Sequence, residues 1–250
     1  MEVVNLSNES IIWLSLAVAI ASMITSITGM AGGVLMFAAM SVYMPVKPLV
    51  AIHGVVQITN NAARAWFLRK DVRWSMCTPF AFGAVIGALI TTLFIVKYVG
   101  EFFPLLILVL LIAYTLFKPK HLPHFKISDK NFFWVGIATG SMGIIVGAID
   151  PLLALFFMRD DMSKEEVVCN KSVMQMFAHL TKIPAFIFLG FSFIDNAYLI
   201  GILSLAAVMG AKLGVIGLRY INTKVFFTLM KLALFIAASR IVFQLIQMGV

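Results

Sequence analysis

Charged residues are scarce in this sequence, and their scarcity excludes an ordinary soluble domain. Asp, Glu, Lys and Arg make up 12% of the 250 residues, whereas hydrophobic residues make up 62%. Soluble globular domains carry about 25% charged residues. The polar stretches are short loops. The sequence therefore predicts an all-α polytopic membrane protein.

Acidic residues are fewer than basic ones, 11 against 19, which gives a net charge of +8. Such an excess can indicate nucleic-acid binding. Here Lys and Arg gather in a few short loops, as the positive-inside rule predicts for cytoplasmic loops. We therefore expect membrane lipid around the protein and no nucleic-acid partner.

Cysteine is rare as well: Cys77 and Cys169 lie in apolar segments and are expected to be buried thiols rather than a disulfide. The sequence has no hydrolase elbow, nucleotide-binding loop, zinc-protease helix or paired cysteine motif. No enzyme activity, resident metal or cofactor is predicted.

The second half of the sequence repeats the first at an offset of 118 positions, with low identity. Gln57 then falls on Gln175 and Gly83 on Gly201, and the breaks in hydropathy coincide better than the residues do. We predict two transmembrane repeats joined by a basic cytoplasmic linker. They cover residues 1–118, 119–130 (the linker) and 131–250.

Each predicted repeat has the same plan. An apolar helix is followed by a break and by a short arm that cannot span a bilayer, which takes about 20 residues. This short interrupted or re-entrant helical hairpin precedes three transmembrane helices. The predicted segments are 11–28, 33–44, 48–68, 74–98 and 101–117 in the first repeat, and 131–146, 151–158, 164–190, 196–219 and 224–247 in the second.

The basic loops indicate opposite orientations of the two repeats. Loops 69–73 and 118–130 are basic and two spans apart, so both are expected in the cytoplasm. Loop 187–195, which matches 69–73, has no Lys or Arg and is expected outside, whereas 215–224 is basic. Inverted repeats with interrupted helices are typical of secondary transporters. Both termini are predicted to be external.

The first break contains Gly29, Gly32 and Gly33. A helix that begins at such a break presents free N–H groups and a positive dipole end, which suit an anion. The alternative is that the glycines only allow close helix packing. We favour the binding interpretation because the second half has a break at the matching place.

That second break contains Asp150 and Pro151 within an apolar block. Asp is a preferred N-cap and Pro is tolerated in the first helical turn, so the pair predicts a helix start. Asp150 could cap the arm only. It could also carry a coupling proton or cation, because acids inside membranes are costly and usually functional.

Polar side chains form a stripe on one face of each helix that follows a short arm. The two stripes match at the offset of 118 positions, and each has a cation at its far end. Cations and amides can replace the hydration shell of a small anion. Alternatively, the cations extend to the membrane surface and the amides only join helices. The predicted substrate-binding residues of the stripes are His53, Gln57, Asn60, Asn61, Arg64, Lys171, Gln175, His179 and Lys182.

The stretches "SITGMAGGVLMFAAMSVYMPVKPLVAIHGVVQITNNAARAWFLRKDV" and "CNKSVMQMFAHLTKIPAFIFLGF" resemble the TauE/SafE family of membrane permeases. The resemblance implies transport of small sulfur-containing or carboxylate anions across the bacterial inner membrane. This chain departs from the family pattern at Asp150, where glycine is more usual. An ionised aspartate would repel an anion unless it is protonated or paired.

We therefore expect an inner-membrane secondary transporter that moves a small anion by alternating access, with a coupling proton. One rival is a cation or metal transporter that uses Asp150, His53 and His179. Others are an intramembrane enzyme and a non-transporting scaffold. The sequence offers neither the second acid nor the activated nucleophile that an intramembrane enzyme would need. A scaffold would not need buried charge.

Overall fold

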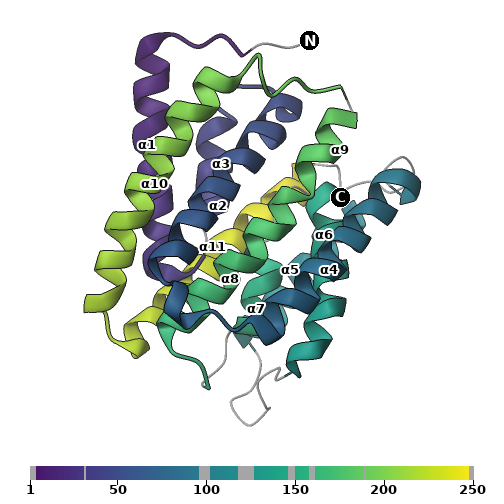
Figure 1. The fold of residues 1–250 in the computed structure, drawn as a ribbon, viewed down its shortest axis with the longest axis vertical. Coiled ribbons are helices and arrows are strands. Elements are labelled where there is room, and N and C mark those ends of the chain that lie inside the picture. Colours follow the sequence, from purple (N-terminus) through teal and green to yellow (C-terminus); the bar gives the residue numbers. More distant parts are fainter. Residues whose placement is uncertain are drawn as a thin grey trace.

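The computed structural model describes residues 4–30, 32–95, 102–117, 127–145, 150–157, 161–188 and 190–247. These residues form helices and no strand, as the sequence predicts (Figure 1). The α-helices are α1 (Asn8–Thr28), α2 (Gly32–Met40), α3 (Val46–Phe67), α4 (Trp74–Ile90), α5 (Phe102–Phe117), α6 (Phe132–Ile145), α7 (Asp150–Phe157), α8 (Lys164–Leu180), α9 (Lys182–Phe188), α10 (Ala197–Tyr220) and α11 (Thr223–Gln247). A π-helical turn at Thr91–Ile95 extends α4.

The predicted short arms exist as the separate helices α2 and α7. The single helix predicted at 164–190 is wrong, because the chain breaks at Thr181 between α8 and α9. Pro184 supplies the physical reason: it has no N–H to donate to the carbonyl of Leu180, and its ring crowds that carbonyl. Most of the predicted linker 119–130 lies outside the described residues.

Local capping signals determine several helix ends. The Ser7 side chain accepts a hydrogen bond from Ser10 N at the start of α1. Gly29 ends α1 in the left-handed conformation, at φ 74°, which glycine adopts without strain. Ser163 and Glu166 form a reciprocal capping box at the start of α8.

The α2 helix packs back against α1. A Cβ atom on Gly32 would lie 1.5 Å from Thr25 Oγ1 and 2.1 Å from the carbonyl oxygen of Ala21. No larger side chain fits there, so Gly32 permits the close approach of the two helices. The first break is therefore the corner of a helical hairpin.

Glycines also bring two long helix pairs into backbone contact. On α4, a Cβ at Gly87 would lie 2.2 Å from the Ile137 carbonyl oxygen of α6. On α10, a Cβ at Gly210 would lie 2.1 Å from the Ala19 carbonyl oxygen of α1. Membrane helices associate through such small residues. The first helix of each half therefore packs against a helix of the other half.

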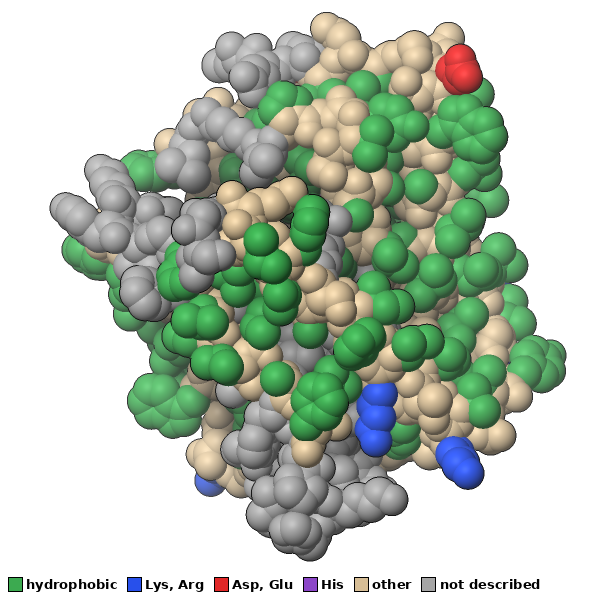
Figure 2. Space-filling view, turned by 180° about the vertical axis from the view of Figure 1, so that it is seen from behind, with side chains coloured by type: hydrophobic (Ala, Val, Ile, Leu, Met, Phe, Trp, Pro, Cys, Tyr) green, Lys and Arg blue, Asp and Glu red, His purple; other side chains and the backbone are tan. Residues whose placement is uncertain are grey.

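The outer surface is apolar in the manner of a membrane protein. Among the described residues, three helical segments are long and apolar enough to cross a bilayer: Asn8–Thr28, Trp74–Ile95 and Ala197–Tyr220. Large apolar side chains such as Trp13, Phe82 and Leu205 point outward from them. Figure 2 shows apolar side chains over much of one face, with Lys and Arg near one end.

We call that end the basic end. It contains the loop between α3 and α4, with Arg69, Lys70 and Arg73, and the loop between α10 and α11, at the bottom of Figure 1. The N-terminal segment lies at the opposite end, where Val4 N donates to Asn196 Oδ1 at 3.0 Å.

Candidate functional site

The two polar stripes predicted on α3 and α8 are buried inside the helix bundle. Every side chain of the set has an exposed fraction of 3% or less. They are His53, Gln57, Asn60, Asn61 and Arg64 on α3, Lys171, Gln175 and His179 on α8, and Lys182 at the start of α9. Buried polar groups are costly in a membrane and are usually functional.

The stripes face each other because α3 and α8 run antiparallel. The imidazole rings of His53 and His179 lie edge to face, with 5.9 Å between centroids. At the other end of the helix pair, Cys169 Sγ lies 3.1 Å from the carbonyl oxygen of Leu68. Gln57 and Gln175 lie between these two contacts along their helices. The structure therefore brings the two predicted stripes together.

Hydrogen bonds connect the α3 stripe to the first break. His53 Nε2 lies 3.1 Å from the carbonyl oxygen of Gly33, and Gln57 Nε2 lies 3.3 Å from the same ring nitrogen. A neutral ring nitrogen either donates or accepts. If His53 Nε2 carries the proton, it donates to the Gly33 carbonyl oxygen. If the proton is on Nδ1, Nε2 accepts a hydrogen bond from the Gln57 side chain.

Further along α3, the amides link to one another and to the guanidinium group. Asn60 Nδ2 donates to Gln57 Oε1 at 3.1 Å, and Asn61 Nδ2 donates to the Gln57 carbonyl oxygen at 2.8 Å. Arg64 donates to Asn61 Oδ1. The side chains along this face are therefore held in defined orientations.

Three cations belong to the same interior region. Arg64, Lys171 and Lys182 are each 1% exposed, so they do not extend to the membrane surface as the alternative interpretation required. Lys182 packs beside Gly54, and Lys182 and Arg64 lie close enough to His179 to act on its charge. By contrast, Lys212 is exposed on α10.

The glycines of the first break contribute carbonyl oxygens to this region. Lys171 Nζ donates to the Gly29 carbonyl oxygen, and the Gly33 carbonyl oxygen faces His53. Gly32 is in tight contact with α1. The prediction that amide N–H groups of this break bind an anion remains a prediction.

Asp150 and Pro151 stand at the start of α7, where the sequence predicts a helix to begin. Their side chains lie outside the described part of the structure. The choice between a helix cap and a coupling residue for Asp150 is therefore still a prediction.

His179 Nδ1 and Asn60 Oδ1 are buried polar atoms of the stripes that have no hydrogen-bond partner among the described residues. In native proteins, atoms of this kind nearly always have a partner. They are therefore candidates for contact with a bound solute.

The side chains of the stripes are buried by protein. The described residues contain no group of three or more His, Cys, Asp and Glu side chains that could hold a metal ion. A cavity of about 540 Å³ lies between α4 and the α8–α9 break. Its lining is apolar and includes none of the predicted site residues.

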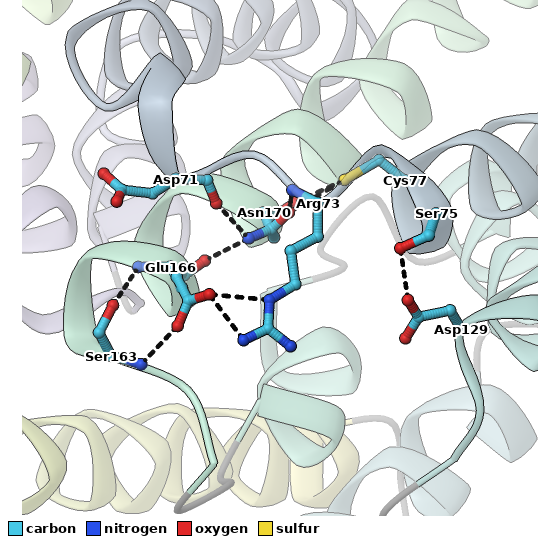
Figure 3. A network of polar contacts seen from close by, with 8 residues as sticks. All are labelled: Asp71, Arg73, Ser75, Cys77, Asp129, Ser163, Glu166 and Asn170. Carbon is cyan, nitrogen blue, oxygen red and sulfur yellow. Dashed lines mark hydrogen bonds and ion pairs between the residues drawn. The ribbon is translucent and has the colours of Figure 1, made fainter.

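Sequence reasoning missed a second polar group, at the basic end. Arg73, Glu166 and Asn170 join the loop after α3 to the start of α8 (Figure 3). The pattern Ser-x-x-Glu at 163–166 was a visible signal for the capping box. No local signal in the sequence indicates that Arg73, in the other half, is the ion-pair partner of Glu166.

A comparison with protein-family models matches residues 14–241 to the family described as sulfite exporter TauE/SafE. The match covers most of the chain. The chain belongs to the TauE/SafE family. Comparisons with curated proteins and with solved structures found no match. This TauE/SafE protein is a transmembrane permease, and the family suggests a sulfur-containing anion as its cargo.

Proposed function

We propose that this protein is a secondary active transporter that moves a small anion across the bacterial inner membrane. Sulfite, an organosulfonate or a related carboxylate would be the cargo. The single observation that carries the proposal is the buried cluster shared by α3, α8 and α9. It combines cations, imidazoles and amides, and the described buried residues of the protein include no carboxylate.

The chemistry of this cluster suits a sulfur oxyanion. Arginine and lysine ammonium groups make short, charge-assisted hydrogen bonds to anionic oxygens, and amides supply neutral donors. The partnerless atom His179 Nδ1 adds a group that can donate when it carries a proton. An anion would be held by His53, Gln57, Asn61, Gln175, His179 and Lys182, with the glycine break beside them.

The proposed mechanism is alternating access between two inverted repeats, with the linker at 119–130 between them and both termini outside. Packing between helices of the two halves supports it. The α1–α10 and α4–α6 contacts are equivalent when the halves are exchanged, because Ala19 and Ile137 match at the offset of 118 positions. The α3–α8 pair also corresponds to itself when the halves are exchanged, and His53 and His179 contact each other within it.

The correspondence between the two halves at the offset of 118 positions is not uniform along the chain. Gly83 touches the Phe133 backbone, whereas a Cβ at Gly201, its partner at the offset of 118 positions, would meet open space. Gly87 and Gly210 make the equivalent contacts instead. Within this proposal, the second half has gained a few residues before Gly210 of α10, relative to Gly87 of α4.

Uptake of labelled sulfite into proteoliposomes tests the function. We expect wild-type flux to follow an imposed pH gradient. The Asp150→Asn variant should still exchange the anion but no longer respond to the gradient, if Asp150 carries the proton. Equal behaviour of both proteins would reduce Asp150 to a helix cap. Absence of flux for sulfite, organosulfonates and carboxylates would contradict the proposal.

A further inference from the structure

The start of α8 is tied to the loop between α3 and α4. Arg73 Nη2 lies 2.6 Å from Glu166 Oε1, and Arg73 Nε donates to the same oxygen at 2.8 Å (Figure 3). Asn170 completes the connection: its Nδ2 donates to the Asp71 carbonyl oxygen at 2.9 Å, and its Oδ1 accepts from Arg73 N at 2.6 Å. These contacts join the two predicted repeats directly.

A second set of contacts holds the same helical turn from another side. Lys164 Nζ donates to the Leu218 carbonyl oxygen at 2.6 Å and to the Ile221 carbonyl oxygen, at the end of α10. Unsatisfied carbonyls at a helix C-terminus attract a cation. The first turn of α8 is thus bound both to the α3–α4 loop and to α10.

These contacts lie next to the buried polar cluster. Asn170 directly precedes Lys171, and Leu68 N bonds to the Arg64 carbonyl oxygen one turn away. Cys77 and Cys169 lie in the same layer and are both 0% exposed. Cys77 Sγ lies 3.4 Å from Asn170 Oδ1. Solvent at the basic end is therefore separated from the cluster by this layer.

The opposite end is closed by different chemistry. At the offset of 118 positions, Glu166 matches Pro48, Asn170 matches Ile52 and Arg73 matches Phe191. Ile52 and Phe191 belong to one buried apolar cluster, together with Leu49. Matching places at the two ends thus hold charged and amide groups in one case and apolar groups in the other.

We propose that Arg73, Glu166 and Asn170 form a polar latch that closes the binding site at the basic end, while Ile52 and Phe191 close the opposite end by apolar contact. Opening toward the basic end must separate the Arg73–Glu166 ion pair and the Asn170 hydrogen bonds. Opening at the other end separates only apolar side chains. The role of the latch in transport rests on the proposed function, but its effect on access can be measured without a substrate.

The accessibility of Cys77 and Cys169 to a thiol reagent shows whether the latch is open. We would label inside-out and right-side-out membrane vesicles with a small, membrane-impermeant methanethiosulfonate and quantify Cys77 and Cys169 adducts by mass spectrometry. The variants are Arg73→Gln and Glu166→Gln, and the second keeps the size of the side chain. We expect labelling from the basic side to rise roughly tenfold in both, since losing charge-assisted contacts shifts the closed–open equilibrium by about that factor.

Arg69→Gln is the matched control. It removes one positive charge from the same loop, but Arg69 stacks on Trp66, 4.8 Å from the ring centroid, and lies outside the latch. Its labelling rate should equal that of the wild type. A folded protein with a released latch should label from the basic side alone, whereas a misfolded variant would label from both sides. In the wild type, 1 M salt should raise the same rate, because salt screens a partly exposed pair.

Wild-type labelling rates in both variants, with no response of the wild type to salt, would overturn the latch. Absence of anion flux in proteoliposomes would overturn the proposed function and leave these labelling rates unaffected.

Discussion

His53 and His179 come from opposite halves of the chain, and their imidazole rings meet edge to face with 5.9 Å between centroids. At this contact the two polar stripes meet. It also brings His179 within the influence of the Lys182 and Arg64 charges. Two titratable rings and two cations therefore share one closed interior region, where an arriving anion would change the charge balance of all four.

Replacing Lys182 by methionine should reduce sulfite flux at least about tenfold, because the change removes a buried charge-assisted donor and keeps the side-chain volume. Lys212→Met is the control, since Lys212 is exposed on α10. Proteoliposome uptake measures both. If Lys182→Met transports sulfite at the wild-type rate, Lys182 does not bind the anion.

Replacing Gly83 by alanine should lower the melting temperature of the purified protein by several degrees. The new Cβ would lie 2.0 Å from the Phe133 carbonyl oxygen, and backbone in a packed pair of helices cannot move away cheaply. Overpacking of this kind costs about 1–3 kcal/mol. Gly201→Ala should be neutral or stabilising, because no atom lies within 4 Å of its Cβ position. Thermal unfolding followed by size-exclusion chromatography compares them, and equal melting temperatures would contradict the α4–α6 contact.

The latch should contribute to stability only while Glu166 is ionised. Burial raises the pKa of Glu166, but hydrogen bonds from the Ser163 backbone and from Arg73, with the Arg73 charge, outweigh it and hold the pKa below its ordinary value of 4.5. A lowered pKa in the folded state stabilises the protein above the unfolded pKa, and this stabilisation disappears as pH falls through the folded value.

We therefore expect Glu166→Gln to melt about 2–4 °C below the wild type at neutral pH, as a loss of about 1 kcal/mol implies. The difference should shrink as the pH falls below 4.5 and vanish once the pH is below the lowered pKa of Glu166 in the folded protein. Burial and the nearby charges of Glu165 and Glu166 raise the pKa of Asp71, which contributes in the opposite direction. Comparing the two proteins at each pH removes the part of this contribution that comes from burial and from Glu165, which both proteins share. Glu165→Gln, which removes a carboxylate 3.6 Å from Lys164, is the control. A melting-point difference that is independent of pH would show that Glu166 acts through shape alone.

Local pattern was enough to predict the candidate site residues as a set. Side chains such as Gln57 and Gln175 recur at helical spacing within apolar segments, and periodicity of this kind depends only on helix geometry. The short arms could be predicted because the apolar segments after the two breaks are too short to span a bilayer. The break at Thr181 was missed although Pro184 was visible, because proline bends some membrane helices without ending them.

The sequence by itself determined the helical membrane class, the two breaks and the two polar stripes, because hydropathy, glycine and proline act locally along the chain. Only the tertiary structure decided that Arg64 and Lys182 turn inward, that Gly32 packs against Thr25, and that Arg73 meets Glu166. The first and third of these outcomes depend on the register between helices from different halves, and the second depends on how α2 folds back on α1. Backbone contacts at Gly87 and Gly210 place α4 against α6 and α10 against α1, and no local signal specifies which carbonyl a distant glycine will meet.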